Sequence, residues 1–203
     1  MKRTTALLAC LLALATAGLA RAQERIPTEQ AQQIAKVLQT HSDKESNLPV
    51  KAEVDSDKPF GVRHEEFGAM AVPDKKLTAE VISKADKDVA PVGHFWMKKL
   101  KPVVDGKPAA TDKLRNVSVD VDNNTINLTF YLLGVRKGEK GDPELVIYGS
   151  GKEPLAVRPL EKAEASQTYP IEIDGREDGD AGLLTLMIAG KYKTTLRVIP
   201  ELD

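Results

Sequence analysis

Apolar and polar residues alternate through most of the second half of the chain. Val117, Val119 and Val121 alternate with polar residues, and the same period of two recurs in six later segments, at residues 126–132, 145–147, 155–157, 169–173, 184–188 and 192–198. This period places successive side chains on opposite faces of a strand. Gly, Pro, Asn or Asp residues separate most segments, and residues 122–124 (Asp-Asn-Asn) are typical of a hairpin turn. Seven short strands predict an antiparallel β-sandwich over residues 112–203.

The first half of the chain has a mixed pattern. Ala31, Ile34, Ala35 and Leu38 recur at helical spacing, which predicts a helix over residues 27–41 with Thr28 as its N-cap. The other elements expected here are strands at residues 50–54, 67–72 and 92–100 and a short helix at 78–86. Prolines and an Asp-Gly turn signal mark a linker at residues 101–112. We therefore expect a mainly β protein, with a small α+β region over residues 23–101 ahead of the sandwich.

One segment of the predicted sandwich resembles a known family. The alternating strand Ile171-x-Ile173 is followed by Asp180-Ala-Gly182-x-Leu184-x-Leu186. This order resembles the passage from strand E to strand F of immunoglobulin-like domains, where Asp-x-Gly-x-Tyr-x-Cys follows an apolar strand. Leu184 and Leu186 stand at the positions of the Tyr and the Cys. The resemblance implies an immunoglobulin-like topology for the C-terminal sandwich.

The N-terminus has the features of a secretory signal peptide. A basic start precedes an uncharged apolar run at residues 6–20, and Ala20 and Ala22 provide the small residues that a signal peptidase recognises. Fifteen apolar residues are too few to span a bilayer comfortably, so we expect a secreted or periplasmic protein with no membrane span after cleavage. Cleavage after Ala22 also removes Cys10, the only cysteine of the chain.

The charge balance argues against one class of partner. The predicted signal peptide holds three of the 29 basic residues and none of the 30 acidic ones, which leaves 26 basic and 30 acidic residues in the mature chain. A net charge of about −4 keeps a protein soluble but does not attract the phosphate backbone of nucleic acids. We therefore expect no nucleic-acid partner.

Candidate catalytic residues are few. His64-Glu65-Glu66 begins like the helical zinc motif of metalloproteases, but Gly68 stands where the second histidine should be. A looser site remains open in which folding brings His64, Glu65 or Glu66, and His94 together for metal-dependent or acid–base hydrolysis. This is the only catalytic constellation that the sequence offers.

Two further sets of residues are candidates for binding. An exposed Trp96, with Lys98 and Lys99 beside it, would suit a carbohydrate or a protein partner. Asp174, Glu177, Asp178 and Asp180 place four carboxylates within seven residues, and such oxygen ligands suit Ca²⁺.

The leading expectation is an exported, non-enzymatic binding or scaffolding protein that acts through contacts with another protein. It rests on the predicted export, the sandwich architecture and the incomplete catalytic motifs. Two alternatives stay open: a hydrolase built on His64, Glu65, Glu66 and His94, and a calcium- or carbohydrate-binding module.

Overall fold

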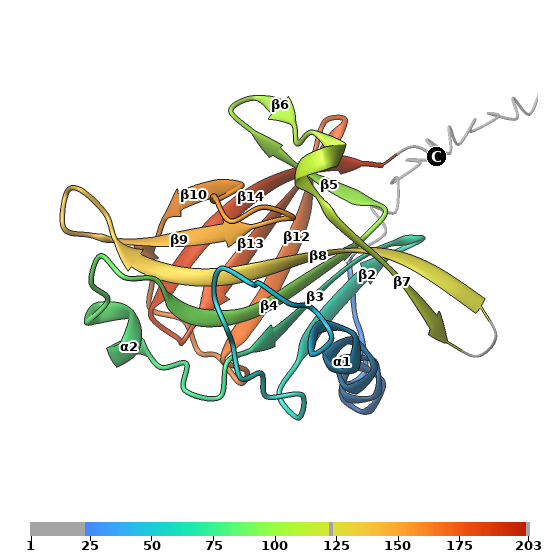
Figure 1. Ribbon diagram of the computed structural model, residues 1–203, viewed down its shortest axis with the longest axis horizontal. Coiled ribbons are helices and arrows are strands. Elements are labelled where there is room, and N and C mark those ends of the chain that lie inside the picture. Colours follow the sequence, from blue (N-terminus) through green and yellow to red (C-terminus); the bar gives the residue numbers. More distant parts are fainter. Residues whose placement is uncertain (1–22, 122–123, 202–203) are drawn as a thin grey trace, which may run out of the picture.

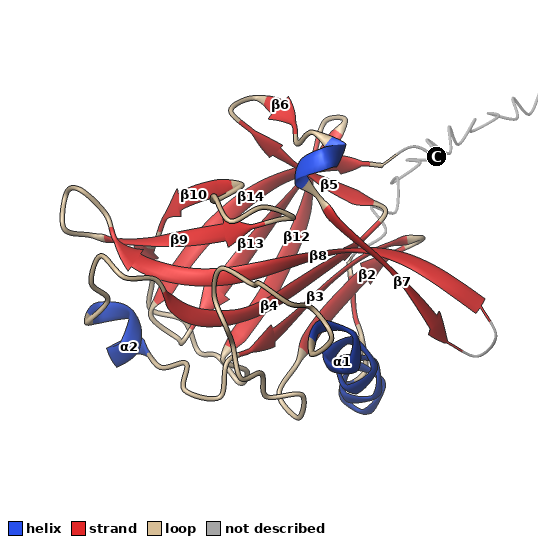
Figure 2. Ribbon diagram, in the orientation of Figure 1, coloured by secondary structure: helices blue, strands red, loops and turns tan. Residues whose placement is uncertain are grey.

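The structure, a computed structural model, describes residues 23–121 and 124–201. The predicted signal peptide and two of the three residues of the predicted turn at 122–124 lie outside these residues. Within the described ranges the protein consists mostly of strands, with two α-helices, α1 (Thr28–Ser42) and α2 (Ala79–Ser83), and one short 3₁₀ helix, η1 (Thr111–Lys113). Figure 2 shows this predominance of strands.

The strands form two antiparallel sheets, which confirms the predicted mainly β fold and its β-sandwich. Eight strands make the larger sheet: β1 (Glu24–Arg25), β2 (Phe60–His64), β3 (Phe67–Pro73), β4 (Ala90–Lys98), β7 (Arg115–Val121), β8 (Asn124–Lys137), β9 (Pro143–Tyr148) and β10 (Ala156–Pro159). Six make the smaller sheet: β5 (Leu100–Val104), β6 (Lys107–Pro108), β11 (Glu161–Lys162), β12 (Ile171–Asp178), β13 (Ala181–Ile188) and β14 (Tyr192–Pro200).

Strands from both sides of the predicted linker lie side by side in the larger sheet, and the linker itself adds strands to the smaller one. In the larger sheet the order is β1-β2-β3-β4-β8-β9-β10, with β7 paired to β8, so the first-half strand β4 lies beside the second-half strand β8. In the smaller sheet β5 pairs with β14. The segment expected to be a linker contains β6 and η1 and parts of β5. The two predicted regions therefore build one sandwich together.

The immunoglobulin-like topology is not confirmed. Strands E and F of that fold belong to opposite sheets. Here β12 and β13, which contain the segment with the resemblance, pair with each other from Ile171↔Ile188 to Asp178↔Ala181 within one sheet. The turn between them is a two-residue hairpin loop, Gly179-Asp180, with Gly179 at a φ of +62°. A glycine at the first loop position suits such a tight hairpin, because it adopts positive φ without strain.

Both faces of the larger sheet are covered. One face packs on the smaller sheet around Phe95, Leu133 and Leu186, and the other packs under α1 and the loop after it around Trp96, Phe130 and Leu38. Figure 1 shows α1 lying across this outer face. As a result β4 is buried without interruption from Val92 to Met97. Each apolar side chain of Leu or Phe size buried in this way stabilises the fold by about 1.5–3 kcal/mol.

The predicted first helix is confirmed as α1, but its N-terminus differs in detail. Pro27 is the N-cap residue, without a side-chain hydrogen bond, and Thr28 is the first helical residue. The Thr28 hydroxyl lies 3.0 Å from the hydroxyl of Tyr169 instead. The second predicted helix begins as expected, because the Thr78 side chain accepts a hydrogen bond from the backbone N–H of Val81.

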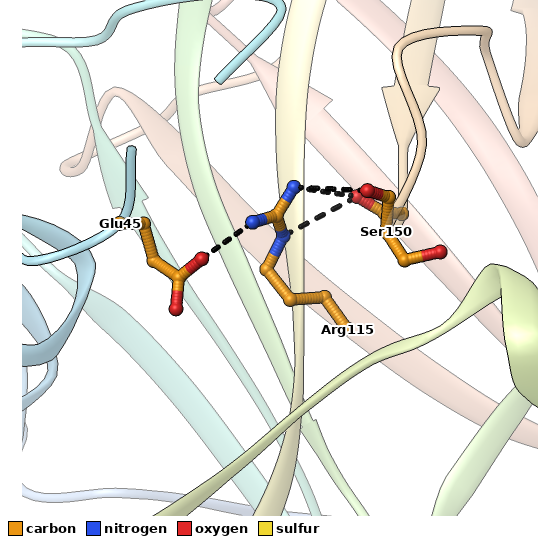
Figure 3. A network of polar contacts seen from close by, with 4 residues as sticks. Glu45, Arg115 and Ser150 are labelled. Carbon is orange, nitrogen blue, oxygen red and sulfur yellow. Dashed lines mark hydrogen bonds and ion pairs between the residues drawn. The ribbon is translucent and has the colours of Figure 1, made fainter. Parts of the chain in front are cut away.

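Arg115 holds the loop after α1 against the larger sheet. Its guanidinium donates to the Glu45 carboxylate at 2.6 Å and to the backbone carbonyls of Gly149 and Ser150 (Figure 3). Its charged group also lies 6.0 Å from the centre of the Phe130 ring. The Arg115 side chain is only 14% exposed, so these contacts replace most of its hydration. One side chain therefore connects the loop, β7 and the segment after β9.

Candidate functional site

A cavity of about 770 Å³ opens between the two sheets, next to the β2–β3 and β12–β13 hairpins. Strand β12 packs beside β2 and β3 at this position. The interior side chains are apolar and come from both sheets: Val62, Ala69, Leu100, Leu184 and Val198. Its volume lies within the range of about 300–1,000 Å³ that is typical of sites for small molecules.

Small residues explain why the space between the sheets is not filled at this end. Gly175 and Gly182 lie at inward-facing positions of β12 and β13, on the same side as the buried Ile173 and Leu184. A glycine offers no side chain to fill the gap, whereas further along the same strands Ile171 and Leu186 close the core completely. The cavity thus lies at the end of the two strands where the alternating pattern places glycines instead of large apolar residues.

The N-terminal segment forms part of the cavity wall. The side-chain amide of Gln23 donates to the carbonyl of Ile173 at 3.3 Å, which connects the edge of the larger sheet to the smaller one. The glutamine occupies the space above Gly175, where an added Cβ would overlap its Oε1. Gly175 therefore makes room for this contact across the two sheets.

Two candidate residues from different parts of the sequence meet at the mouth of the cavity. The His64 Nε2 lies 4.0 Å from the Glu177 Oε1, and both residues line the cavity. His64 follows Phe60 and Val62 on the inward side of β2, and Glu177 follows Ile173 and Gly175 on the inward side of β12. The His64 side chain is 30% exposed and that of Glu177 is 81% exposed, so the pair lies at the solvent boundary.

Both hairpin turns add an acidic residue to this mouth. Asp180 is the second loop residue of the β12–β13 turn, and Glu65 is the first residue of the β2–β3 turn. Glu65 adopts a φ of +54°, a conformation that residues other than glycine seldom take. The rim therefore combines one imidazole with carboxylates from both sheets.

Two arginines, Arg63 and Arg176, also line the cavity but occupy outward positions of their strands. Arg63 lies on the outward side of β2 and is paired with Glu24, at 3.0 and 3.1 Å. This hydrogen-bonded pair lowers the pKa of Glu24 and raises that of Arg63. Arg176 occupies an outward position of β12, in phase with the exposed Asp174. Among the described residues that line the cavity, the inward-facing charge is thus mainly negative.

The predicted site of two histidines is not formed. His94 lies on the opposite face of the larger sheet from His64, in the same row as Trp96 and in the cluster under α1. It is only 4% exposed, and burial lowers its pKa to about 4. None of the described residues forms a hydrogen bond with its Nε2. A shared metal or a shared proton relay would need both rings on one side of the sheet.

The predicted binding surface at Trp96 is also absent, because the indole is buried. Trp96 is 2% exposed and stacks on Phe130, with ring centres 4.3 Å apart. Both faces of this sheet are covered, so the adjacent rings of Phe95 and Trp96 are both buried. Lys98 is half-buried, and Lys99 donates to the Glu66 carboxylate at 2.9 Å.

The four carboxylates proposed for Ca²⁺ do not converge. Asp174 and Asp178 occupy outward positions of β12, whereas Glu177 occupies an inward one. The Asp178 carboxylate pairs with Arg197 at 3.4 Å on the outer face. In the part of the chain that the structure describes, no group of three or more His, Cys, Asp or Glu residues is arranged to hold a metal ion.

Comparisons of the chain with family models, with curated proteins and with solved structures each gave no match. Across residues 23–121 and 124–201, no helix is long and apolar enough to cross a membrane. The cavity itself is therefore the feature from which a function has to be inferred. Sequence reasoning did not find it, although the inward-facing glycines 175 and 182 were a signal that could have indicated it.

Proposed function

We propose that this protein is a non-enzymatic binding protein that holds a small, mainly apolar molecule in the cavity between its two sheets. The observation behind the proposal is the combination of a cavity of about 770 Å³, apolar inner walls and a polar rim. Sites for small molecules commonly have this composition, in which the apolar walls supply most of the affinity and a few polar groups orient the ligand.

The hydrolase alternative has less support. It relied on His64 and His94 acting together, and these residues lie on opposite faces of one sheet. His64 and Glu177 remain near each other, but at 4.0 Å they are beyond hydrogen-bond distance. The expected contact with another protein stays a prediction. The cavity by itself is better matched to a small ligand than to a flat protein surface.

A neutral fluorescent probe tests the proposal. We expect N-phenyl-1-naphthylamine to bind the purified protein saturably at one site, with increased emission. A variant that fills the cavity, Gly182→Leu, should bind the probe at least tenfold more weakly. Position 182 has an ordinary φ, and an added Cβ would lie 3.2 Å from a methyl group of Val198, which a small side-chain shift can relieve.

Thr195→Leu is the matched control. Thr195 is exposed on the outer face of β14 in the same sheet, so this leucine adds apolar area without entering the cavity. It should leave the affinity for the probe unchanged, and unfolding in urea should show that both variants are folded. Absence of saturable binding to the parent protein, or equal affinity of Gly182→Leu and the parent, would overturn the proposal.

A further inference from the structure

The rim of the cavity carries an asymmetry of charge that bears on the ligand. Glu177 faces inward at the mouth, Asp180 lies in the adjoining turn, and both line the cavity. Two basic side chains that also line the cavity, those of Arg63 and Arg176, lie at outward strand positions, and Arg63 is paired with Glu24. A ligand with its apolar part inside the cavity would therefore present its polar end to carboxylates.

From this arrangement we infer that the preferred ligand is an amphipathic cation, whose apolar chain lies between the sheets and whose ammonium group lies beside Glu177. The inference rests on the proposed function, because it assigns a polar end to the molecule that the cavity holds. Charge complementarity at the mouth, added to the apolar interior, distinguishes this ligand from a neutral or anionic one of the same size.

The size of the expected effect follows from the exposure of the carboxylate. Two opposite charges about 4 Å apart attract by about 1 kcal/mol in water, which corresponds to a factor of about five in affinity. The Glu177 side chain is 81% exposed, which puts it close to the water limit. We therefore expect a preference of about fivefold for a cation over a neutral ligand, and a similar factor for a neutral ligand over an anion.

Three ligands with the same eight-carbon chain provide the test: octylammonium, 1-octanol and octanoate. Each is titrated against the complex of the protein with N-phenyl-1-naphthylamine, at pH 8 and low salt, and the displacement of the probe gives its affinity. The expected order is octylammonium, then 1-octanol, then octanoate. Because the rim is exposed, the preference for octylammonium should decrease as salt is added.

Glu177→Gln and Asp174→Asn form a matched pair of variants. Both residues lie on β12 and both changes remove one negative charge, but residue 177 faces the cavity and residue 174 faces outward. Glu177→Gln should lower the affinity for octylammonium about three- to fivefold and leave that for 1-octanol unchanged. Asp174→Asn should leave both affinities near those of the parent protein, because its charge is on the far side of the sheet.

The possible failures are distinguishable. If the probe itself does not bind, 1-octanol has nothing to displace and the proposed function fails. If 1-octanol binds but octylammonium binds no more tightly, or octanoate binds best, the cavity is a binding site and only the inference about charge is overturned. Equal losses in Glu177→Gln and Asp174→Asn would also overturn it, because the effect would then come from net charge.

Discussion

The imidazole of His94 packs edge-on against the ring of Phe130, with ring centres 4.9 Å apart, inside the apolar layer between the larger sheet and α1. Burial in this layer disfavours the charged imidazolium and lowers the pKa of His94 to about 4. The native state therefore holds this histidine uncharged at neutral pH.

We expect His94 to make the protein less stable in acid. The unfolded chain takes up a proton at this residue near pH 6.5, whereas the folded chain does so only near pH 4. Below pH 6.5 the unfolded state thus binds more protons, and stability falls as the pH drops from 6.5 to 4. The difference of 2.5 pH units corresponds to about 3 kcal/mol. Urea unfolding at several pH values measures it.

A substitution separates this effect from the titration of carboxylates in the same range. His94→Leu removes the proton-binding group. The loss in the free energy of unfolding between pH 6.5 and 4 should therefore be smaller in this variant, by roughly the same 3 kcal/mol. His41→Gln, at the end of α1, should retain the decrease of the parent protein. An unchanged pH profile in His94→Leu would show that other groups cause the acid sensitivity.

Gly93 should tolerate no side chain. It lies at the irregular pairing between β4 and β8, at a φ of +151°, and an added Cβ would lie 2.4 Å from the carbonyl oxygen of Val72 in the neighbouring strand. Gly93→Ala should therefore lower the free energy of unfolding by at least about 3 kcal/mol, from backbone strain and from the clash together.

Gly106→Ala is the corresponding control. Gly106 also has a positive φ, +77°, but nothing lies within 4 Å of an added Cβ. Gly106→Ala should lower the free energy of unfolding by only about 1 kcal/mol, which is the cost of a positive φ in alanine. Similar losses at both positions, measured by denaturant unfolding, would mean that β4 shifts to relieve the contact.

Arg115 should contribute more to stability than a surface arginine. Arg115→Ala removes the hydrogen bonds to Glu45 and to the Gly149 and Ser150 carbonyls, and it leaves these acceptors poorly hydrated. We expect a loss of about 2–3 kcal/mol in the free energy of unfolding. Arg197→Ala, which breaks the ion pair between Asp178 and this 54% exposed arginine, should cost less than about 1 kcal/mol. Equal losses would contradict the structural role assigned to Arg115.

The alternating pattern predicted most strands of the second half, and in β12, β13 and β14 it corresponds to one face in the core and the other nearer solvent. It misled where the larger sheet is covered on both faces. Residues 50–54 alternate in burial as expected, yet only Val54 forms a bridge, to Asp74, because the segment packs over the sheet as a loop. Strand β2 was missed, since only Phe60 and Val62 mark its alternation before His64.

The candidate site was harder to predict than the fold. His64 and Glu177 were each identified, but for different kinds of chemistry, and no local pattern indicates that β2 and β12 pack beside each other. That contact depends on the order of strands in two sheets, which is set by pairings between distant segments. By contrast, the separation of Asp174 from Glu177 follows from the period of two alone, so the argument against a shared metal was available in the sequence.

Trp96 offers a direct check on where ligands bind. It is the only tryptophan of the chain, it is buried against Phe130, and it faces the layer under α1 rather than the cavity between the sheets. Its emission in the native protein should therefore lie to the blue of that in urea, and acrylamide should quench it slowly. Saturation with 1-octanol, which has no chromophore, should leave the emission unchanged while it displaces the naphthylamine probe. A shift of Trp96 emission that follows 1-octanol binding would instead place the ligand under α1, where a helix rather than a second sheet covers it.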